Sequence, residues 1–202
     1  RIFLNISGQT TPDLISIFDN LLKNSREFKI KGSHYPSGAR IVTESGEVLG
    51  SCLRAQYYSW NGEQEQEELD TSGLWKMDIG NAIHDWVAKY SEKVFHSTHE
   101  YPIIYHPDFL KNPIRGRIDT LVLDSPVGNF GIEIKSAYGK GMTSKDSGIK
   151  YVGPKISHLM QAYIYLVISR LPDEEKLKFM PLDEVRKFTL PVLDYFILFY
   201  IA

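Results

Sequence analysis

The sequence predicts an α/β domain, and three features carry this prediction. A strongly periodic helix over residues 78–94 is followed by three apolar, strand-like runs, and a second helix over residues 156–169 precedes a closing apolar run. Of the 202 residues, 43% are hydrophobic and 24% are charged, which is typical of folded globular proteins rather than disordered chains. The length fits one domain with a small appendage.

The amino-terminal part is expected to be partly helical. A first helix is predicted after Thr11, a suitable cap, and its apolar face contains Leu14, Ile17, Phe18, Leu21 and Leu22. Residues 25–51 follow no period, so an irregular segment is expected there. Residues 52–60 are expected to be helical, and the acidic stretch 63–70 to be a loop or an exposed helix. We therefore interpret residues 1–77 as an extension packed on a core of residues 78–202.

The helix over residues 78–94 has a single apolar stripe at helical spacing, formed by Ile79, Ile83, Trp86, Val87, Tyr90 and Val94. His84 lies beside this stripe. A histidine in such a place is more often a core or surface residue than a ligand.

The strand-like runs cover residues 101–105, 114–123 and 130–134. The turn-rich sequence DSPVGN separates the last two and predicts a hairpin. In the second helix the residues expected to face inward are Leu159, Met160, Tyr163, Leu166 and Val167. The closing strand is predicted over residues 192–201.

The charge balance limits the kinds of partner. The net charge is −2, whereas a protein that coats nucleic acid is usually basic, so any nucleic-acid surface must be local. A glycine-rich segment offers one, because lysines recur there at Lys135, Lys140, Lys145, Lys150 and Lys155. A solvated loop is the alternative interpretation.

Cys52 is the only cysteine, which excludes an intrachain disulfide and a zinc site or iron–sulfur cluster with four cysteines from this chain. A single cysteine also fits a reducing compartment, and a cytoplasmic location is expected. The longest apolar run, residues 195–202, is too short to span a bilayer, and the polar amino end predicts no signal peptide.

The pattern Glu-x-Lys occurs three times, beginning at Glu27, Glu133 and Glu174. Only Glu133 and Lys135 lie at the end of an apolar strand, where the period of two puts both side chains on one face. The two charges are therefore either a surface ion pair or part of a functional site.

Asp119 favours a functional site, because it interrupts an apolar run in the hairpin partner of the Glu133 strand. A buried charge is costly unless it is paired or bound to a metal. If the hairpin forms, Asp119 and Glu133 can approach each other, and a divalent cation would relieve their repulsion. Such a cation suits the attack of an activated water on a phosphodiester.

Four short motifs occur in order on these elements: Gly80-x-x-x-His84, Gly116-x-x-Asp119, Glu133-x-Lys135 and Gln161-x-x-x-Tyr165. With them, the chain from residue 78 onwards resembles the RecB-like branch of the PD-(D/E)xK nuclease superfamily. The resemblance implies a restriction-endonuclease-like core, in which a mixed central sheet is flanked by helices.

Upstream, the run from Cys52 to Tyr58 is similar to the C-x-R-x-x-Y-Y segment of CRISPR-associated RecB-type and AddB-type exonucleases. In those relatives the cysteine ligates an iron–sulfur cluster with three later cysteines, and none follows Cys52 here. Either this member lacks the cluster or the chain ends before those cysteines. For the chain as given, we expect no iron–sulfur cluster and a buried Cys52.

The resemblance implies a deoxyribonuclease that depends on Mg²⁺ or Mn²⁺, and an exonuclease acting on DNA ends or single strands. The implied metal ligands are His84, Asp119, Glu133 and the backbone carbonyl of Ile134. Asp119, Glu133 and Lys135 form the implied catalytic set, in which Lys135 orients the attacking water and stabilises charge on the phosphate. The candidate DNA contacts are Arg54, Arg115, Arg117, Gln161, Tyr165, Lys140, Lys145 and Lys150. Bracing of Lys135 is the alternative role of Gln161 and Tyr165.

Two other functions stay open. A nuclease fold without activity would serve as a DNA-binding or assembly module, although all four motifs are intact. A small-molecule phosphohydrolase would use the same metal chemistry, but no glycine-rich phosphate loop is present. The expected partners are DNA and the proteins of a bacterial or phage repair, recombination or replication complex, with no membrane partner.

Overall fold

The computed structural model describes residues 32–50, 71–137, 153–177 and 190–201, together with residues 16, 19–21, 23, 52, 54, 57, 58 and 61. None of the described helices combines the length and the apolarity that a membrane span requires. Cys52 is exposed, so the expectation of a buried cysteine is wrong.

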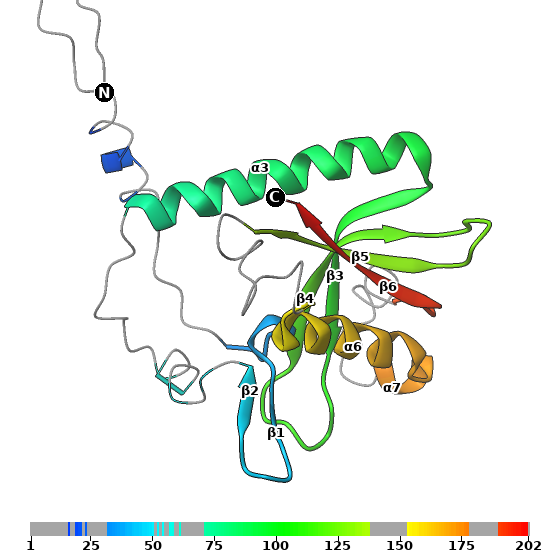
Figure 1. Ribbon diagram of the computed structural model, residues 1–202. Helices are drawn as coiled ribbons and strands as arrows, with labels where there is room; N and C mark the ends of the chain where they lie inside the picture. The colour runs from blue at the N-terminus through cyan, green and yellow to red at the C-terminus, as the bar shows by residue number, and fades with distance from the viewer. Residues whose placement is uncertain are drawn as a thin grey trace, which may run out of the picture.

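Four strands form a mixed sheet flanked by helices, and the domain is therefore α/β (Figure 1). In sheet order the strands are β3 (Ser97–Tyr105), β4 (Ile114–Val122), β5 (Phe130–Ser136) and β6 (Tyr195–Ile201). β3 and β4 pair in antiparallel orientation, as do β4 and β5, because short connections join them. β6 is parallel to β5, since α6 (Ile156–Arg170) and α7 (Asp173–Leu177) lie in the long connection between them.

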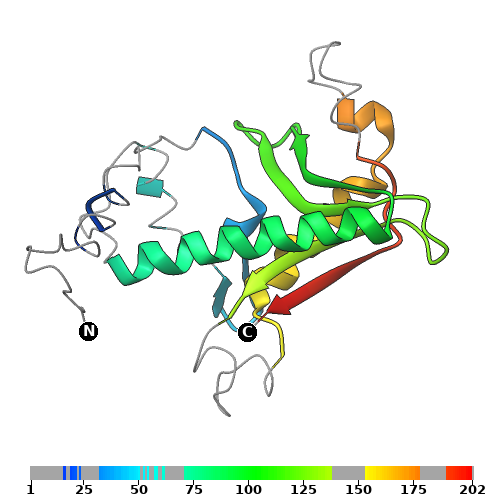
Figure 2. The same cartoon turned by 90° about the horizontal axis from the view of Figure 1, so that it is seen from above.

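Helices cover both faces of the sheet (Figures 1 and 2). The cluster between α3 (Thr71–Val94) and one face consists of Val87, Val122, Phe130, Ile132 and Ile134. The cluster between α6 and the other face includes Tyr165, Ile168, Ile103, Ile118 and Leu121. The polar residues of β5 therefore belong to a sheet that is covered by helices on both faces.

The order of helix, three strands, helix and strand agrees with the sequence prediction, but several boundaries differ. α3 begins at Thr71 rather than residue 78, β3 at Ser97 rather than residue 101, and β6 at Tyr195 rather than residue 192. The expected division of the chain between residues 77 and 78 falls inside α3 and stays a prediction.

Residues 32–50 are more regular than expected. They contain η1 (Pro36–Gly38) and a hairpin of β1 (Arg40–Val42) and β2 (Val48–Gly50). His34 joins this segment to the end of β4, since its N–H donates to the Pro113 carbonyl and its carbonyl accepts from the Arg115 N–H, both at 2.8 Å. Hydrogen bonds between backbone groups do not depend on hydrophobic side chains, so this pairing produces no hydrophobic periodicity in the sequence.

Several large apolar residues of α3 face away from the sheet, although Val87 and Ile83 pack against it. Side chains at the centre of the predicted stripe are exposed, among them Ile79, Trp86 and Tyr90. The buried positions of the helix are instead Leu74, Gly80, Val87 and Ser91. Small residues on the inner face let the helix approach the sheet closely, which a hydrophobicity pattern does not reveal.

The inward face of α6 also differs from the prediction. Leu159, Tyr163 and Val167 are exposed, so placing them inward was wrong. The buried residues are Gln161, Ala162, Tyr165, Ile168 and Ser169. Polar groups occupy this face because their hydrogen-bond partners lie on β4, β5 and the segment before β6.

Candidate active site

Strand β5 carries two charged residues near its carboxyl end, Glu133 and Lys135. Glu133 is only 2% exposed, because β5 lies between β4 and β6 and beneath α6. Its Oε1 accepts hydrogen bonds from Lys135 Nζ at 2.5 Å and from Gln161 Nε2 at 2.6 Å. Lys135 Nζ also donates to Gln161 Oε1 at 3.3 Å, so the three side chains form a closed triangle.

The second carboxylate oxygen of Glu133, Oε2, is buried and has no hydrogen-bond partner among the described residues. An unpaired buried acceptor typically costs about 1–3 kcal/mol. Burial, followed by the negative charge of Asp119, raises the pKa of Glu133 to about 7, although Lys135 and Gln161 act in the opposite direction. An oxygen in this state is well suited to bind a cation.

Asp119 lies where strands β4 and β5 separate. Towards the site, the ladder between them ends at the pair of Thr120 and Ile132. Beyond it, Asp119 Oδ2 accepts a hydrogen bond from the backbone N–H of Ile134 at 2.7 Å. At this point the Asp119 side chain, rather than the backbone of β4, forms the hydrogen bond to β5. Asp119 thereby brings a second carboxylate near Glu133.

The two carboxylates oppose each other's ionisation. Burial raises the pKa of Asp119, while the hydrogen bond from Ile134 and the nearby His84 and Lys135 act to lower it. The charge of Asp119 in turn raises the pKa of Glu133. Two neighbouring desolvated carboxylates are both ionised readily only when a cation joins them.

His84 reaches the site from α3. Its Nδ1 lies 3.6 Å from Asp119 Oδ1, which is within ion-pair range but too long for a hydrogen bond. One turn earlier, Gly80 is buried against β5, and a Cβ there would lie 3.3 Å from Ser136 Oγ. The Gly80-x-x-x-His84 motif therefore has a physical basis, since the glycine lets the helix bring the histidine to Asp119.

Gly116 and Tyr165 fit each other in the same way. A Cβ on Gly116 would lie 2.5 Å from the Tyr165 hydroxyl oxygen, so only glycine leaves room for the ring. The Tyr165 hydroxyl donates to the Arg117 carbonyl at 3.0 Å, and burial raises its pKa. Of the two roles expected for Gln161 and Tyr165, this geometry fits bracing of the site, because both side chains are buried.

The other expected DNA contacts are dispersed. Arg117 is exposed beside the site and forms an ion pair with Glu100, and Arg115 is exposed two residues earlier. Lys140, Lys145 and Lys150 lie outside the described residues.

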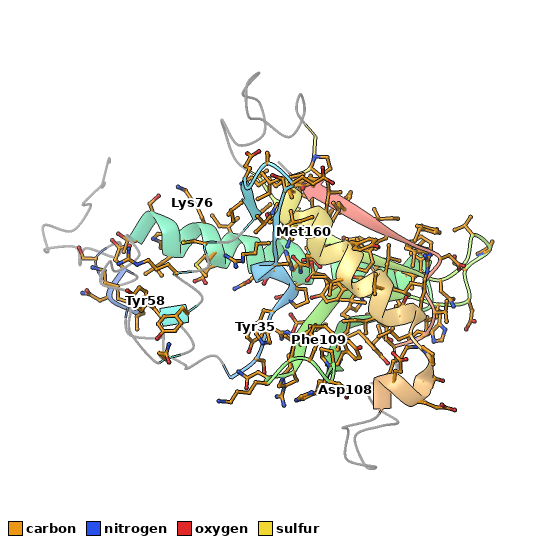
Figure 3. All side chains as sticks on the ribbon, turned by 90° about the horizontal axis from the view of Figure 1, so that it is seen from below. Tyr35, Tyr58, Lys76, Asp108, Phe109 and Met160 are labelled. Carbon is orange, nitrogen blue, oxygen red and sulfur yellow. The ribbon has the colours of Figure 1, made fainter. Side chains whose placement is uncertain are left out.

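Arg54 lies on another part of the molecule. Its guanidinium carbon is 5.6 Å from the centre of the Tyr58 ring. Figure 3 shows Tyr58 near the amino-terminal end of α3, apart from Met160 on α6. A DNA contact by Arg54 would therefore be separate from the group around Lys135.

His158 is a neighbour of the site that the sequence interpretation missed. It lies one turn before Gln161 on α6, and its Nδ1 is 2.6 Å from the hydroxyl of Tyr200 on β6. Burial, followed by the positive charges of Lys135 and Lys155, lowers its pKa to about 4. Its spacing of three residues from Gln161 on one helix face is the signal that would have found it.

The donors present fit a Mg²⁺ or Mn²⁺ ion, although no three His, Cys, Asp or Glu side chains among the described residues form a complete metal-binding group. The unpartnered Glu133 Oε2 and the Asp119 carboxylate are hard oxygen ligands. His84, whose Nδ1 lies beside Asp119, is the candidate third ligand, although Mg²⁺ and Mn²⁺ prefer oxygen donors. Magnesium usually keeps several waters and needs only one or two carboxylates, so an incomplete protein shell is adequate.

In comparisons with known proteins, this chain is similar only to solved structures, and the likeness is weak. No protein-family model matches the chain, and a search of curated proteins finds no match. Three chains of solved structures match it, and one is described as the crystal structure of SSO0001. That match has 19% sequence identity and a TM-score of 0.47, and it covers 76% of this chain and 66% of that one. At this level of likeness we infer neither fold family nor function from it.

Proposed function

We propose that the chain is a metal-dependent deoxyribonuclease of the RecB-like type, with a restriction-endonuclease-like core, and an exonuclease on DNA ends or single strands. The observation that carries the proposal is the group of Asp119, Glu133 and Lys135 where β4 and β5 separate. Two carboxylates with raised pKa values meet an ammonium group, and one carboxylate oxygen is buried without a partner. Hydrolysis of a phosphodiester with a metal ion uses this set of groups.

The residues that would hold Mg²⁺ or Mn²⁺ are Asp119, Glu133 and His84, with the backbone carbonyl of Ile134. When bound, the cation supplies charge stabilisation to the phosphate and lowers the pKa of a water molecule. Glu133 and Asp119 are already desolvated, which favours binding of a cation over binding of a proton above neutral pH.

Lys135 supplies the positive charge next to the carboxylates. Glu133 Oε1 and Gln161 Oε1 hold its ammonium group from two sides. In that position it is able to orient the attacking water and to stabilise the charge that develops on the phosphate. Gln161 uses both ends of its amide here, since its Nε2 donates to Glu133 while its Oε1 accepts from Lys135.

Asp119 is held by one backbone hydrogen bond, and the strand just before it is held by Tyr165. The Ile134 N–H binds its Oδ2, which leaves Oδ1 on the side of His84. Two residues earlier, the Tyr165 hydroxyl binds the carbonyl of Arg117. These two hydrogen bonds hold the Asp119 carboxylate in place where β4 no longer pairs with β5.

The direct test is incubation with end-labelled DNA, single- and double-stranded, linear and circular, with Mg²⁺, Mn²⁺ or EDTA. We expect metal-dependent release of short products from linear DNA and little attack on circles. Asp119→Ala should abolish the reaction. Glu174→Gln is the matched control, because it changes the glutamate of another Glu-x-Lys pair, exposed on α7, and should leave cleavage unchanged.

Two outcomes would contradict parts of the proposal. Absence of cleavage of every DNA with either metal would refute the nuclease activity and favour the inactive binding module. Rapid attack on circular DNA would replace exonuclease with endonuclease. Calorimetric titration with Mn²⁺ tests the ligands separately, since wild-type affinity in Asp119→Ala would refute the assignment of Asp119.

A further inference from the structure

Glu100 has a left-handed backbone conformation in the middle of β3, with a φ of +49°. Among the described residues only one other non-glycine residue, Asp124, has a positive φ, and it lies in the turn after β4. Such a conformation costs free energy for a residue with a Cβ. The ladder between β3 and β4 pairs the residues on either side of Glu100 but not Glu100 itself, which the register sets opposite Asp119.

The side chain of Glu100 is paired with Arg117 on β4. Arg117 Nη1 donates to Glu100 Oε2, and the side chains are 63% exposed for Arg117 and 61% exposed for Glu100. Ion pairs that face solvent contribute little to stability. The unusual backbone of Glu100 is therefore not explained by the stability that this pair adds.

Arg117 lies at the edge of the candidate active site. It precedes Asp119 by two residues, and Tyr165 holds its carbonyl while its guanidinium extends into solvent. Burial is the main cause of the raised pKa of Asp119, and the negative charge of Glu100 adds to it. Glu100 is thus within electrostatic reach of the site although its side chain is bound to Arg117.

We propose that Glu100 occupies Arg117 in the free protein as an internal substitute for a DNA phosphate, which the substrate displaces when it binds. The inference rests on the proposed function and specifies how that substrate is admitted. A guanidinium binds a carboxylate and a phosphate through the same fork of N–H donors. Because both partners face solvent, the exchange requires no movement of the core.

The exchange selects among anions. A polyanionic strand held by further contacts displaces Glu100, whereas a single, weakly held anion must compete with a carboxylate that the backbone keeps in place. Removing the Glu100 charge should therefore tighten DNA binding. From the free energy of an exposed ion pair, about 0.2–1 kcal/mol, we expect about 1.5- to fivefold tighter binding.

The test is fluorescence anisotropy with a labelled single-stranded oligonucleotide in EDTA, so that cleavage does not interfere. The variants are Glu100→Gln, Glu100→Gly, Arg117→Gln and the double variant Glu100→Gln/Arg117→Gln. Glycine accepts the positive φ, so Glu100→Gly removes the carboxylate without adding strain. The matched control is Asp124→Asn, since Asp124 is also acidic, exposed, ion-paired and left-handed, but lies beyond the other end of β4.

We expect both Glu100 variants to bind DNA about 1.5- to fivefold more tightly and Asp124→Asn to match the wild type. Arg117→Gln should weaken binding, and the double variant should match Arg117→Gln. Unchanged or weaker binding by the Glu100 variants would overturn the inference and leave the proposed function standing. The inference would also be overturned if Glu100→Gln tightened DNA binding equally in the wild-type and Arg117→Gln backgrounds. The effect would then be due to the overall charge of the protein and not to the release of Arg117. Failure of the wild type to bind DNA would also overturn the inference, whereas the proposed function is tested separately by cleavage with Mg²⁺ or Mn²⁺.

Discussion

Glu133 should make the metal-free protein less stable as the pH rises. In the unfolded chain this carboxyl loses its proton near its ordinary pKa of 4.5, whereas in the folded protein burial and Asp119 raise the pKa to about 7. Between these values the folded state binds the proton and the unfolded state does not. The free energy of unfolding therefore falls from about pH 4.5 to about pH 7 and stays at the lower level above it.

The size of the effect follows from the two pKa values. Each unit of difference corresponds to about 1.4 kcal/mol, so the interval from 4.5 to about 7 predicts a loss of about 3 kcal/mol. Glu133→Gln removes the ionisation and keeps an oxygen to accept from Gln161. Between pH 4.5 and pH 7 the wild type should therefore lose about 3 kcal/mol of unfolding free energy relative to Glu133→Gln.

The measurement is urea denaturation followed by far-ultraviolet circular dichroism at several pH values between 4.5 and 8, in EDTA. It is repeated with Mn²⁺, which should restore stability to the wild type above pH 7 but not to Glu133→Gln. Glu174→Gln should follow the wild type throughout, because Glu174 is exposed. A difference between Glu133→Gln and wild type that does not change with pH would refute the reasoning, since Glu133 would then not be desolvated.

Three further results are expected. Lys135→Gln should bind Mn²⁺ in calorimetry but cleave DNA at least ~10²-fold more slowly, because a transition-state charge loses its stabiliser; a near-normal rate would make Lys135 only a structural partner. Gly116→Ala should lower the unfolding free energy by about 1–3 kcal/mol in urea denaturation, because its Cβ would meet the Tyr165 ring. Gly32→Ala is the control and should not lower the unfolding free energy, because a Cβ at Gly32 would meet open space. Equal stabilities of the Gly116→Ala and Gly32→Ala variants would contradict the contact between Gly116 and Tyr165. Changing Lys140, Lys145 and Lys150 together to Gln should weaken DNA binding and lower its salt slope by about 0.7–0.9 per lost phosphate contact; an unchanged slope would favour a solvated loop.

The sequence predicted the helices and strands better than the faces they bury. Hydrophobic periodicity located α3 and α6, but three of the residues it placed on the inner side of α6, Leu159, Tyr163 and Val167, are exposed. The reason is that this side is formed by groups such as Gln161 and Ser169, whose burial depends on partners elsewhere in the chain. A single sequence contains no direct signal for such partners.

The candidate site was predicted as a set of residues but not as a geometry. The hairpin predicted that Asp119 and Glu133 approach each other, and the structure brings Asp119 to the N–H of Ile134. The left-handed conformation of Glu100 was not predictable, because it arises within an otherwise regular strand and not at a turn-forming sequence. The separation of β4 and β5 was equally hidden, since it depends on strand register.

The mismatch between the apolar stripe of α3 and its buried face has a consequence for how this protein tolerates mutation. In an ordinary amphipathic helix, large apolar positions are the sensitive ones. In α3 the exposed Trp86 and Tyr90 should accept polar replacements readily, whereas larger side chains should be tolerated poorly at the buried Ser91 and at Gly80, where a Cβ would lie 3.3 Å from Ser136 Oγ. A saturation-mutagenesis profile of this helix should therefore depart from its hydropathy profile, with tolerance at Trp86 and Tyr90 and with sensitivity at Gly80 and Ser91 as well as at Leu74 and Val87.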